Sequence, residues 1–122
     1  RDKNMGKNSL STSFGYAIDG VIYAFWRERN MKIHLLAAIA VVIAGIYLGI
    51  NRLEWGLLSF TVALVIITEV INTAIEKTVD LVTDQYHPLA KLAKNMAAGA
   101  VLLSAINALI MAYIIFGPYL IL

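Results

Sequence analysis

Three long runs of apolar residues constrain this chain more than any other feature. They cover residues 35–50, 55–68 and 97–117, and none contains a charged side chain. The third run is long enough to cross a bilayer as a helix, which takes about 20 residues. The first run can extend back to residue 31, because Lys32 and His34 can snorkel to the interface. The second run continues towards residue 83 without a helix breaker.

Composition supports a single membrane domain over residues 1–122. The chain is 60% hydrophobic and 15% charged, whereas soluble domains are about half apolar and a quarter charged. It has no cysteine, which excludes disulfides, Cys-type zinc sites and iron–sulfur clusters. The net charge of +2 is small and scattered, so nothing indicates nucleic acid as a partner. No cleavable signal peptide is expected before the first run.

The predicted fold is an all-α membrane protein. An interfacial amphipathic helix is expected over residues 10–30, capped by Ser11 or Ser13. Helices containing the three spans are expected over residues 31–50, 53–83 and 88–117. Along the first helix the apolar side chains share one face at helical spacing. These are Phe14, Ile18, Val21, Ile22 and Phe25.

Loop charges predict the topology, since cytoplasmic loops are enriched in Lys and Arg. The segment before the first span and the link between the second and third carry nine of the ten basic residues. They are Arg1, Lys3, Lys7, Arg27, Arg29, Lys32, Lys77, Lys91 and Lys94. We therefore expect a multi-pass plasma-membrane protein with a cytoplasmic N-terminus and an extracellular C-terminus.

The second span ends in a polar stripe. At roughly 100° per residue, Glu69, Asn72, Thr73, Glu76 and Asp80 share one face. Glu69 follows fourteen uncharged residues, and a carboxylate at membrane depth is costly unless it is paired or faces a polar cavity, so such groups are functional candidates. We expect a general base at Glu69, and a cation such as Mg²⁺ near Glu76 and Asp80. The alternative interpretation is the solvated end of a long helix.

Three further features bear on a site. Lys91 and Lys94 share a face and could bind phosphates, or simply anchor the helix on the cytoplasmic side. Glu28, at the end of the interfacial helix, falls near its apolar side and could turn towards the bundle. Small residues on the third span predict close helix packing. They are Ala93, Ala97, Ala100, Ser104, Ala108 and Ala112. Three short spans cannot enclose a nucleotide and a lipid, so a homo-oligomer is expected.

Residues 69–80 read EVINTAIEKTVD, and after a short loop residues 93–101 read AKNMAAGAV. This pattern resembles the prokaryotic diacylglycerol kinase family, which are small integral-membrane lipid kinases. The resemblance runs from about residue 14 to residue 118. It implies a homotrimer with shared sites at the cytoplasmic interface, ATP as phosphoryl donor and Mg²⁺ as cofactor. The stretches at residues 27–34 and 80–94 look like the Gram-positive form, which phosphorylates undecaprenol. Diacylglycerol is the alternative lipid substrate.

The resemblance also implies roles for individual residues. Glu69 matches the general base, and Glu69 and Ala98 match lipid-binding positions. Glu28 and Glu76 match the metal-binding carboxylates. The residues that match nucleotide-binding positions are Tyr16, Glu28, Asn72, Glu76, Asp80, Gln85, Tyr86, His87, Lys94 and Asn95.

One position departs from the family pattern, which has Asp where this chain has Asn95. Asn cannot carry a negative charge, so we expect this position to weaken activity. Two alternatives from other classes are a small oligomeric proton or cation transporter and a non-catalytic adaptor. A transport path should line the whole bilayer with polar groups, whereas here they cluster at one end. An adaptor leaves Glu69 unexplained.

Overall fold

The computed structural model describes residues 9–120. Arg1, Lys3 and Lys7, which contribute to the charge argument, lie outside the described residues. The described part forms four helices and no strand, which confirms the all-α prediction. They are α1 (Leu10–Arg27), α2 (Arg29–Leu48), α3 (Arg52–Val82) and α4 (Pro88–Leu120).

Both ends of the helical region differ from expectation. Ser9, and not Ser11 or Ser13, caps α1: its hydroxyl accepts a hydrogen bond from the Thr12 N–H at 3.2 Å. The two expected caps instead lie inside the helix. At the other end, α4 continues three residues past residue 117, through Pro118. Pro118 cannot donate the backbone hydrogen bond to the carbonyl four residues earlier, and α4 ends two residues after it.

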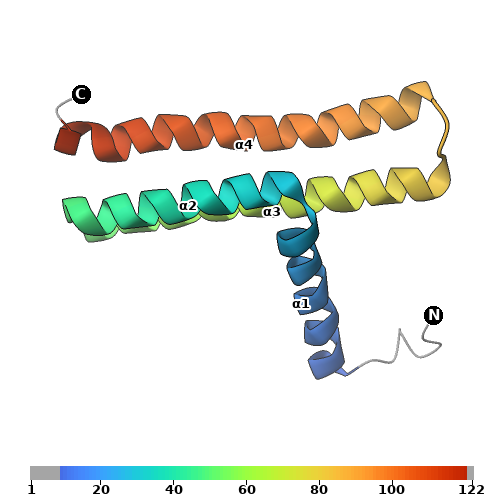
Figure 1. Cartoon of the computed structure of the whole chain (residues 1–122), viewed down its shortest axis with the longest axis horizontal. Coiled ribbons are helices and arrows are strands. Elements are labelled where there is room, and N and C mark those ends of the chain that lie inside the picture. The colour runs from blue at the N-terminus through green and yellow to red at the C-terminus, as the bar shows by residue number, and fades with distance from the viewer. Residues whose placement is uncertain (1–8, 121–122) are drawn as a thin grey trace.

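Helices α2, α3 and α4 run side by side, and α1 crosses their direction from the point where α2 begins (Figure 1). α2 has 20 residues, or about 30 Å, the thickness of a bilayer core. α3 and α4 have 31 and 33 residues, so each reaches about 47–50 Å. Both therefore extend beyond the level of α1 and are joined there by residues 83–87 (Figure 1).

α4 packs mainly on α3. The hydroxyls of Thr68 and Ser104 join the two helices by a hydrogen bond of 3.0 Å. Ala97 and Ser104, two members of the small-residue stripe, are buried, as close packing requires. At the end remote from the 83–87 loop, an apolar cluster centres on Leu58, Ile115 and other buried side chains.

The corner between α1 and α2 is held against the rest of the chain. Ala24 and Met31 on either side of the corner are buried, Met31 completely. The ammonium group of Lys77 on α3 lies 4.9 Å from the centroid of the Tyr23 ring, a cation–π contact. These contacts place Glu28, the residue that separates α1 from α2, beside α3.

α2, α3 and α4 are each long and apolar enough to cross a membrane. Large apolar side chains on them face outward, for example Leu36 and Phe60. The apolar face of α1, including Phe14 and Ile18, is also exposed. A helix that lies in the membrane interface presents such a face to lipid. The arrangement therefore agrees with an interfacial helix and three spans.

Candidate functional site

Glu69 is the most deeply buried charged residue among those described, with 1% of its surface exposed. Its Oε2 atom lies 3.7 Å from His34 Nε2 on α2. That distance is too long for a hydrogen bond but short enough for an ion pair with a protonated imidazole. Within residues 9–120, Oε2 has no hydrogen-bond partner. A buried carboxylate oxygen without a donor is costly and free to accept a proton or hydrogen bond from a ligand.

The rest of the stripe becomes more exposed along α3. Asn72 and Thr73 are buried, and their side-chain oxygens also have no hydrogen-bond partner in the described part of the chain. Glu76 is half-buried and Asp80 is exposed. Asp80 therefore fits the alternative interpretation, in which the stripe is the solvated end of a long helix. Glu69, Asn72 and Thr73 do not fit it, because they are buried.

Glu28 and Glu76 face the same region from two elements. Both are half-buried, and together with His34 they are the charged groups close enough to act on the Glu69 carboxylate. Neither forms an ion pair with another described residue. Among residues 9–120 no three His, Asp or Glu side chains gather as a metal cage. Two carboxylates nevertheless fit Mg²⁺, which takes one or two and completes its shell with water and phosphate oxygens.

A cavity of about 310 Å³ lies between the ends of α3 and α4 and the loop that joins them. Lys94 Nζ lies 2.6 Å from Asp80 Oδ1 at its wall, so this cation and carboxylate neutralise one another. The cavity brings together six of the residues expected to bind nucleotide. They are Asp80, Gln85, Tyr86, His87, Lys94 and Asn95.

His87 also has a local structural role. Its Nδ1 atom accepts a hydrogen bond from the Leu89 N–H at 3.1 Å, and its carbonyl accepts one from the Lys91 N–H. The side chain thereby caps the first turn of α4, where backbone donors lack helical partners. Only Nε2 of this ring remains to contact a ligand. Ala98, expected to bind lipid, lies outside this cavity. The other four residues expected to bind nucleotide also lie outside it, namely Tyr16, Glu28, Asn72 and Glu76.

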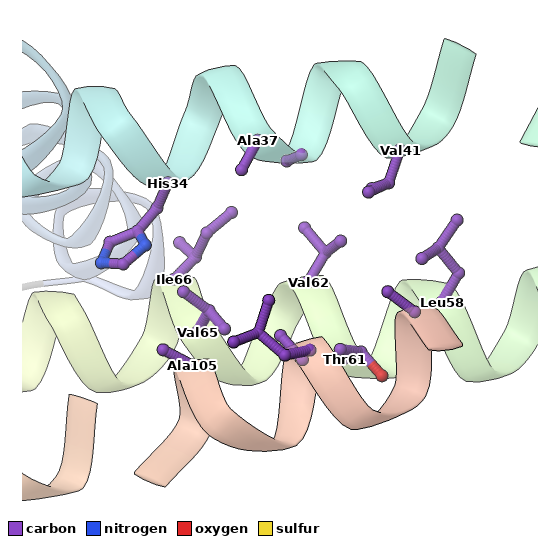
Figure 2. A pocket seen from close by; sticks show the side chains of 13 residues that line it. His34, Ala37, Val41, Leu58, Thr61, Val62, Val65, Ile66 and Ala105 are labelled. Carbon is purple, nitrogen blue, oxygen red and sulfur yellow. The ribbon is translucent and has the colours of Figure 1, made fainter. Parts of the chain in front are cut away.

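A second cavity, of about 250 Å³, lies among α2, α3 and α4 at the level of the spans. Its wall is almost entirely apolar, with small residues from α2 and α4, such as Ala37, Ala108 and Ala112. Figure 2 shows the imidazole of His34 reaching from α2 towards α3 at one end of the row, with Leu58 at the other end. Glu69 does not line this cavity, but His34, which does, lies 3.7 Å from the Glu69 carboxylate. Part of a hydrocarbon chain in the cavity can therefore place its polar end near this pair.

His34 is the residue that the sequence interpretation missed. We expected it to snorkel to the membrane interface, but only 19% of its side chain is exposed, and it points to Glu69. The available signal was its position beside an apolar run, where ionisable groups are functional candidates. Its partner, 35 positions later, could not be identified from spacing.

Comparison with known proteins connects this geometry to a family. The family model for prokaryotic diacylglycerol kinase matches residues 15–116. This chain belongs to the prokaryotic diacylglycerol kinase family. It is 40% identical to undecaprenol kinase of Bacillus subtilis over 98% of both chains. It is 48% identical to a diacylglycerol kinase of Synechocystis over 84% of this chain and 59% of that protein, and 34% identical to a diacylglycerol kinase of Escherichia coli over 86% of each.

Membership of the prokaryotic diacylglycerol kinase family confirms the prediction of a membrane lipid kinase. A kinase also accounts for the two kinds of cavity better than a transporter or an adaptor. One cavity has several polar and charged side chains in its wall, among them Lys94 and Asp80, whereas the wall of the other is almost entirely apolar. His34, which lines the apolar cavity, lies 3.7 Å from Glu69.

Proposed function

We propose that this protein transfers the γ-phosphoryl group of ATP to the hydroxyl of undecaprenol, with Mg²⁺ as cofactor. The observation that carries the proposal is the buried Glu69 carboxylate, which has an unpartnered oxygen and lies 3.7 Å from His34, a residue that lines an apolar intramembrane cavity. The choice of undecaprenol is supported by the relative from Bacillus subtilis, which matches over almost its full length. The stretches at residues 27–34 and 80–94 support the same choice.

Glu69 acts on the lipid hydroxyl. With the hydrocarbon chain in the apolar cavity, the hydroxyl end lies at His34 and Glu69. The free Oε2 atom accepts the hydroxyl hydrogen bond and then the proton as the oxygen bonds to phosphorus. Burial excludes water, which would otherwise compete with the lipid for the phosphoryl group. Orientation and deprotonation of the nucleophile are thus assigned to one side chain.

The nucleotide, the metal ion and the base are proposed to lie in sequence along α3. At 1.5 Å per residue, Glu76 lies about 10 Å and Asp80 about 16 Å from Glu69 along the helix axis. The polar cavity at Asp80 and Lys94 receives the nucleotide, and its phosphates extend along the stripe towards Glu69. Glu28 and Glu76 hold Mg²⁺, which offsets charge on the phosphates when bound. Lys94 supplies a further positive charge, and phosphoryl transfer depends mainly on such positioning and neutralisation.

We place the site at the cytoplasmic face of the plasma membrane and propose a homotrimer. α2 has little contact with α4, and large apolar side chains remain exposed on every span. Neighbouring copies can cover this surface and bring Tyr16 and Ala98, which lie outside both cavities, to a shared site. Sedimentation in detergent should give three chains per particle. A monomer that is fully active would contradict a shared site.

Diacylglycerol is the second candidate substrate. Relatives from Synechocystis, Helicobacter pylori and Escherichia coli carry the name diacylglycerol kinase. A cavity that accepts an isoprenoid chain could also hold one acyl chain. The two candidates differ in the lipid and share the catalytic residue.

The test is transfer of labelled phosphate from ATP, with Mg²⁺, to undecaprenol and to diacylglycerol in parallel mixed micelles. We expect label mainly on undecaprenol. Glu69→Gln should lower kcat by about a hundredfold or more, because the amide cannot accept the proton. Asp19→Asn, the same carboxylate-to-amide change on an exposed face of α1, should have wild-type activity.

Each outcome has a separate meaning. Label mainly on diacylglycerol would favour the second candidate. Label on neither lipid, even after Asn95→Asp, would refute the kinase proposal for this chain. An active Glu69→Gln variant would leave the kinase in place and exclude Glu69 as its base.

A further inference from the structure

The side chains of His34 and Glu69 lie 3.7 Å apart in a region where charge is costly. Their side chains are 19% and 2% exposed, and they belong to different helices. Among the described residues, His34 is the basic side chain within ion-pair distance of the Glu69 carboxylate, and the carboxylates of Glu28 and Glu76 lie in the same region. A buried carboxylate facing two others needs a compensating cation to remain charged.

His34 also lies where the lipid substrate is proposed to bind. Its imidazole lines one end of the apolar cavity (Figure 2) and lies 3.7 Å from Glu69, so His34 stands between the cavity and the proposed base. The separation of 3.7 Å is only slightly longer than a hydrogen bond. A small rotation of either side chain would bring Nε2 to one carboxylate oxygen and leave the other oxygen for the hydroxyl.

We propose that His34 is the positioning residue for Glu69, which rests on the lipid kinase function proposed above. The imidazolium holds the carboxylate ionised and directed into the cavity. During transfer, the hydroxyl proton moves to Glu69, the hydroxyl oxygen bonds to the γ-phosphorus, and the bond from phosphorus to ADP breaks. His34 keeps its proton in this step. It acts through Glu69 and takes no part in binding ATP.

Replacement of His34 by alanine tests this role. His34→Ala should lower kcat by about tenfold or more, since general-base catalysis depends on an ionised, oriented base. The KM values for ATP and lipid should stay within about twofold, because the side chain serves the chemical step. The variant leaves a space beside the cavity, so added imidazole should restore part of the lost kcat. Lost packing would not respond in this way.

Leu36→Ala is the matched control, because Leu36 lies on the same helix, is 68% exposed and does not line the cavity. It should have wild-type kcat with and without imidazole. His34→Gln is a second variant that keeps volume and a hydrogen-bond donor but loses the charge. It should fold and show a similar fall in kcat, which imidazole does not relieve because no space is left. Circular dichroism of each variant reports folding.

The results separate this inference from the proposed function. If the unsubstituted protein labels no lipid, the proposed function fails. If it is active and His34→Ala has the kcat of Leu36→Ala, the positioning role is refuted while the kinase stands. A loss confined to KM, or a kcat loss in His34→Ala that imidazole does not relieve, also refutes it.

Discussion

Asp80 and Glu69 share one stripe of α3, but their surroundings give them different chemistry. Asp80 is exposed and pairs with Lys94 at 2.6 Å, as is common for surface charges. Glu69 is buried beside His34 and lacks a hydrogen-bond donor. Burial of a carboxylate oxygen without a donor carries a desolvation penalty, and a hydrogen bond from the substrate hydroxyl would offset it. We therefore expect substitutions at Glu69 to affect the chemical step and those at Asp80 to affect nucleotide binding.

Asn95 is a residue at which activity can be raised. It lines the polar cavity next to Lys94, at a position where the family pattern has Asp. A carboxylate forms stronger hydrogen bonds than an amide oxygen. Asn95→Asp should therefore increase kcat/KM for ATP by about tenfold, equivalent to about 1.4 kcal/mol. Steady-state kinetics in the same lipid would measure it, and an unchanged value would show that charge at this position is unimportant here.

At the scale of elements, the turn between α2 and α3 is specified almost completely by its residues. Gly49 has φ of 65° and closes α2, while the Ile50 N–H bonds back to the Gly45 carbonyl at 3.2 Å. Asn51 and Glu54 then form a reciprocal capping box that starts α3. Such a turn reverses the chain within three residues and sets α2 antiparallel to α3.

Gly49→Ala should destabilise the protein by about 1 kcal/mol, because a Cβ atom is unfavourable in the left-handed region. Gly56→Ala is the control: Gly56 is helical, and a Cβ there meets nothing within 4 Å. That change should be neutral or slightly stabilising, since alanine favours helix. Unfolding by a denaturing detergent would compare the two. Equal midpoints would mean that the turn relaxes without cost.

At the scale of the whole molecule, unequal helix lengths separate the two cavities. α2 is about as long as a bilayer is thick, whereas α3 and α4 are longer and carry the polar cavity beyond the level of α1. The apolar cavity lies among all three spans. Glu69 and the α1–α2 corner lie between the two, so a lipid in one and a nucleotide in the other can meet at this residue.

The proposed topology can be tested with single cysteines, because the chain contains none. Arg52→Cys, at the first residue of α3, and Asp84→Cys, in the loop between α3 and α4, introduce exposed thiols at opposite ends of α3. A membrane-impermeant maleimide should label Arg52→Cys in intact cells and Asp84→Cys only after permeabilisation. The distribution of Lys and Arg is the reason for this expectation. The opposite pattern of labelling would invert the topology.

Several features followed from the sequence alone. The apolar runs predicted three spans, and the 3.6-residue period predicted α1 and the stripe on α3, because these patterns depend on neighbouring residues. The block at residues 69–80 identified the family. The fourteen uncharged residues before Glu69 also marked it as an unusual carboxylate, and the structure buries it. The small residues of α4 correctly indicated packing against another helix.

Tertiary structure decided which distant side chains meet. His34 pairs with Glu69, and the Thr68 and Ser104 hydroxyls join, because α2 and α4 flank α3 in a particular register. No spacing rule relates residues on different helices, so the positions of the two cavities could not be predicted. Local patterns determine each helix and its faces. Packing between helices, which depends on the shapes of many side chains at once, determines where polar groups are left without partners.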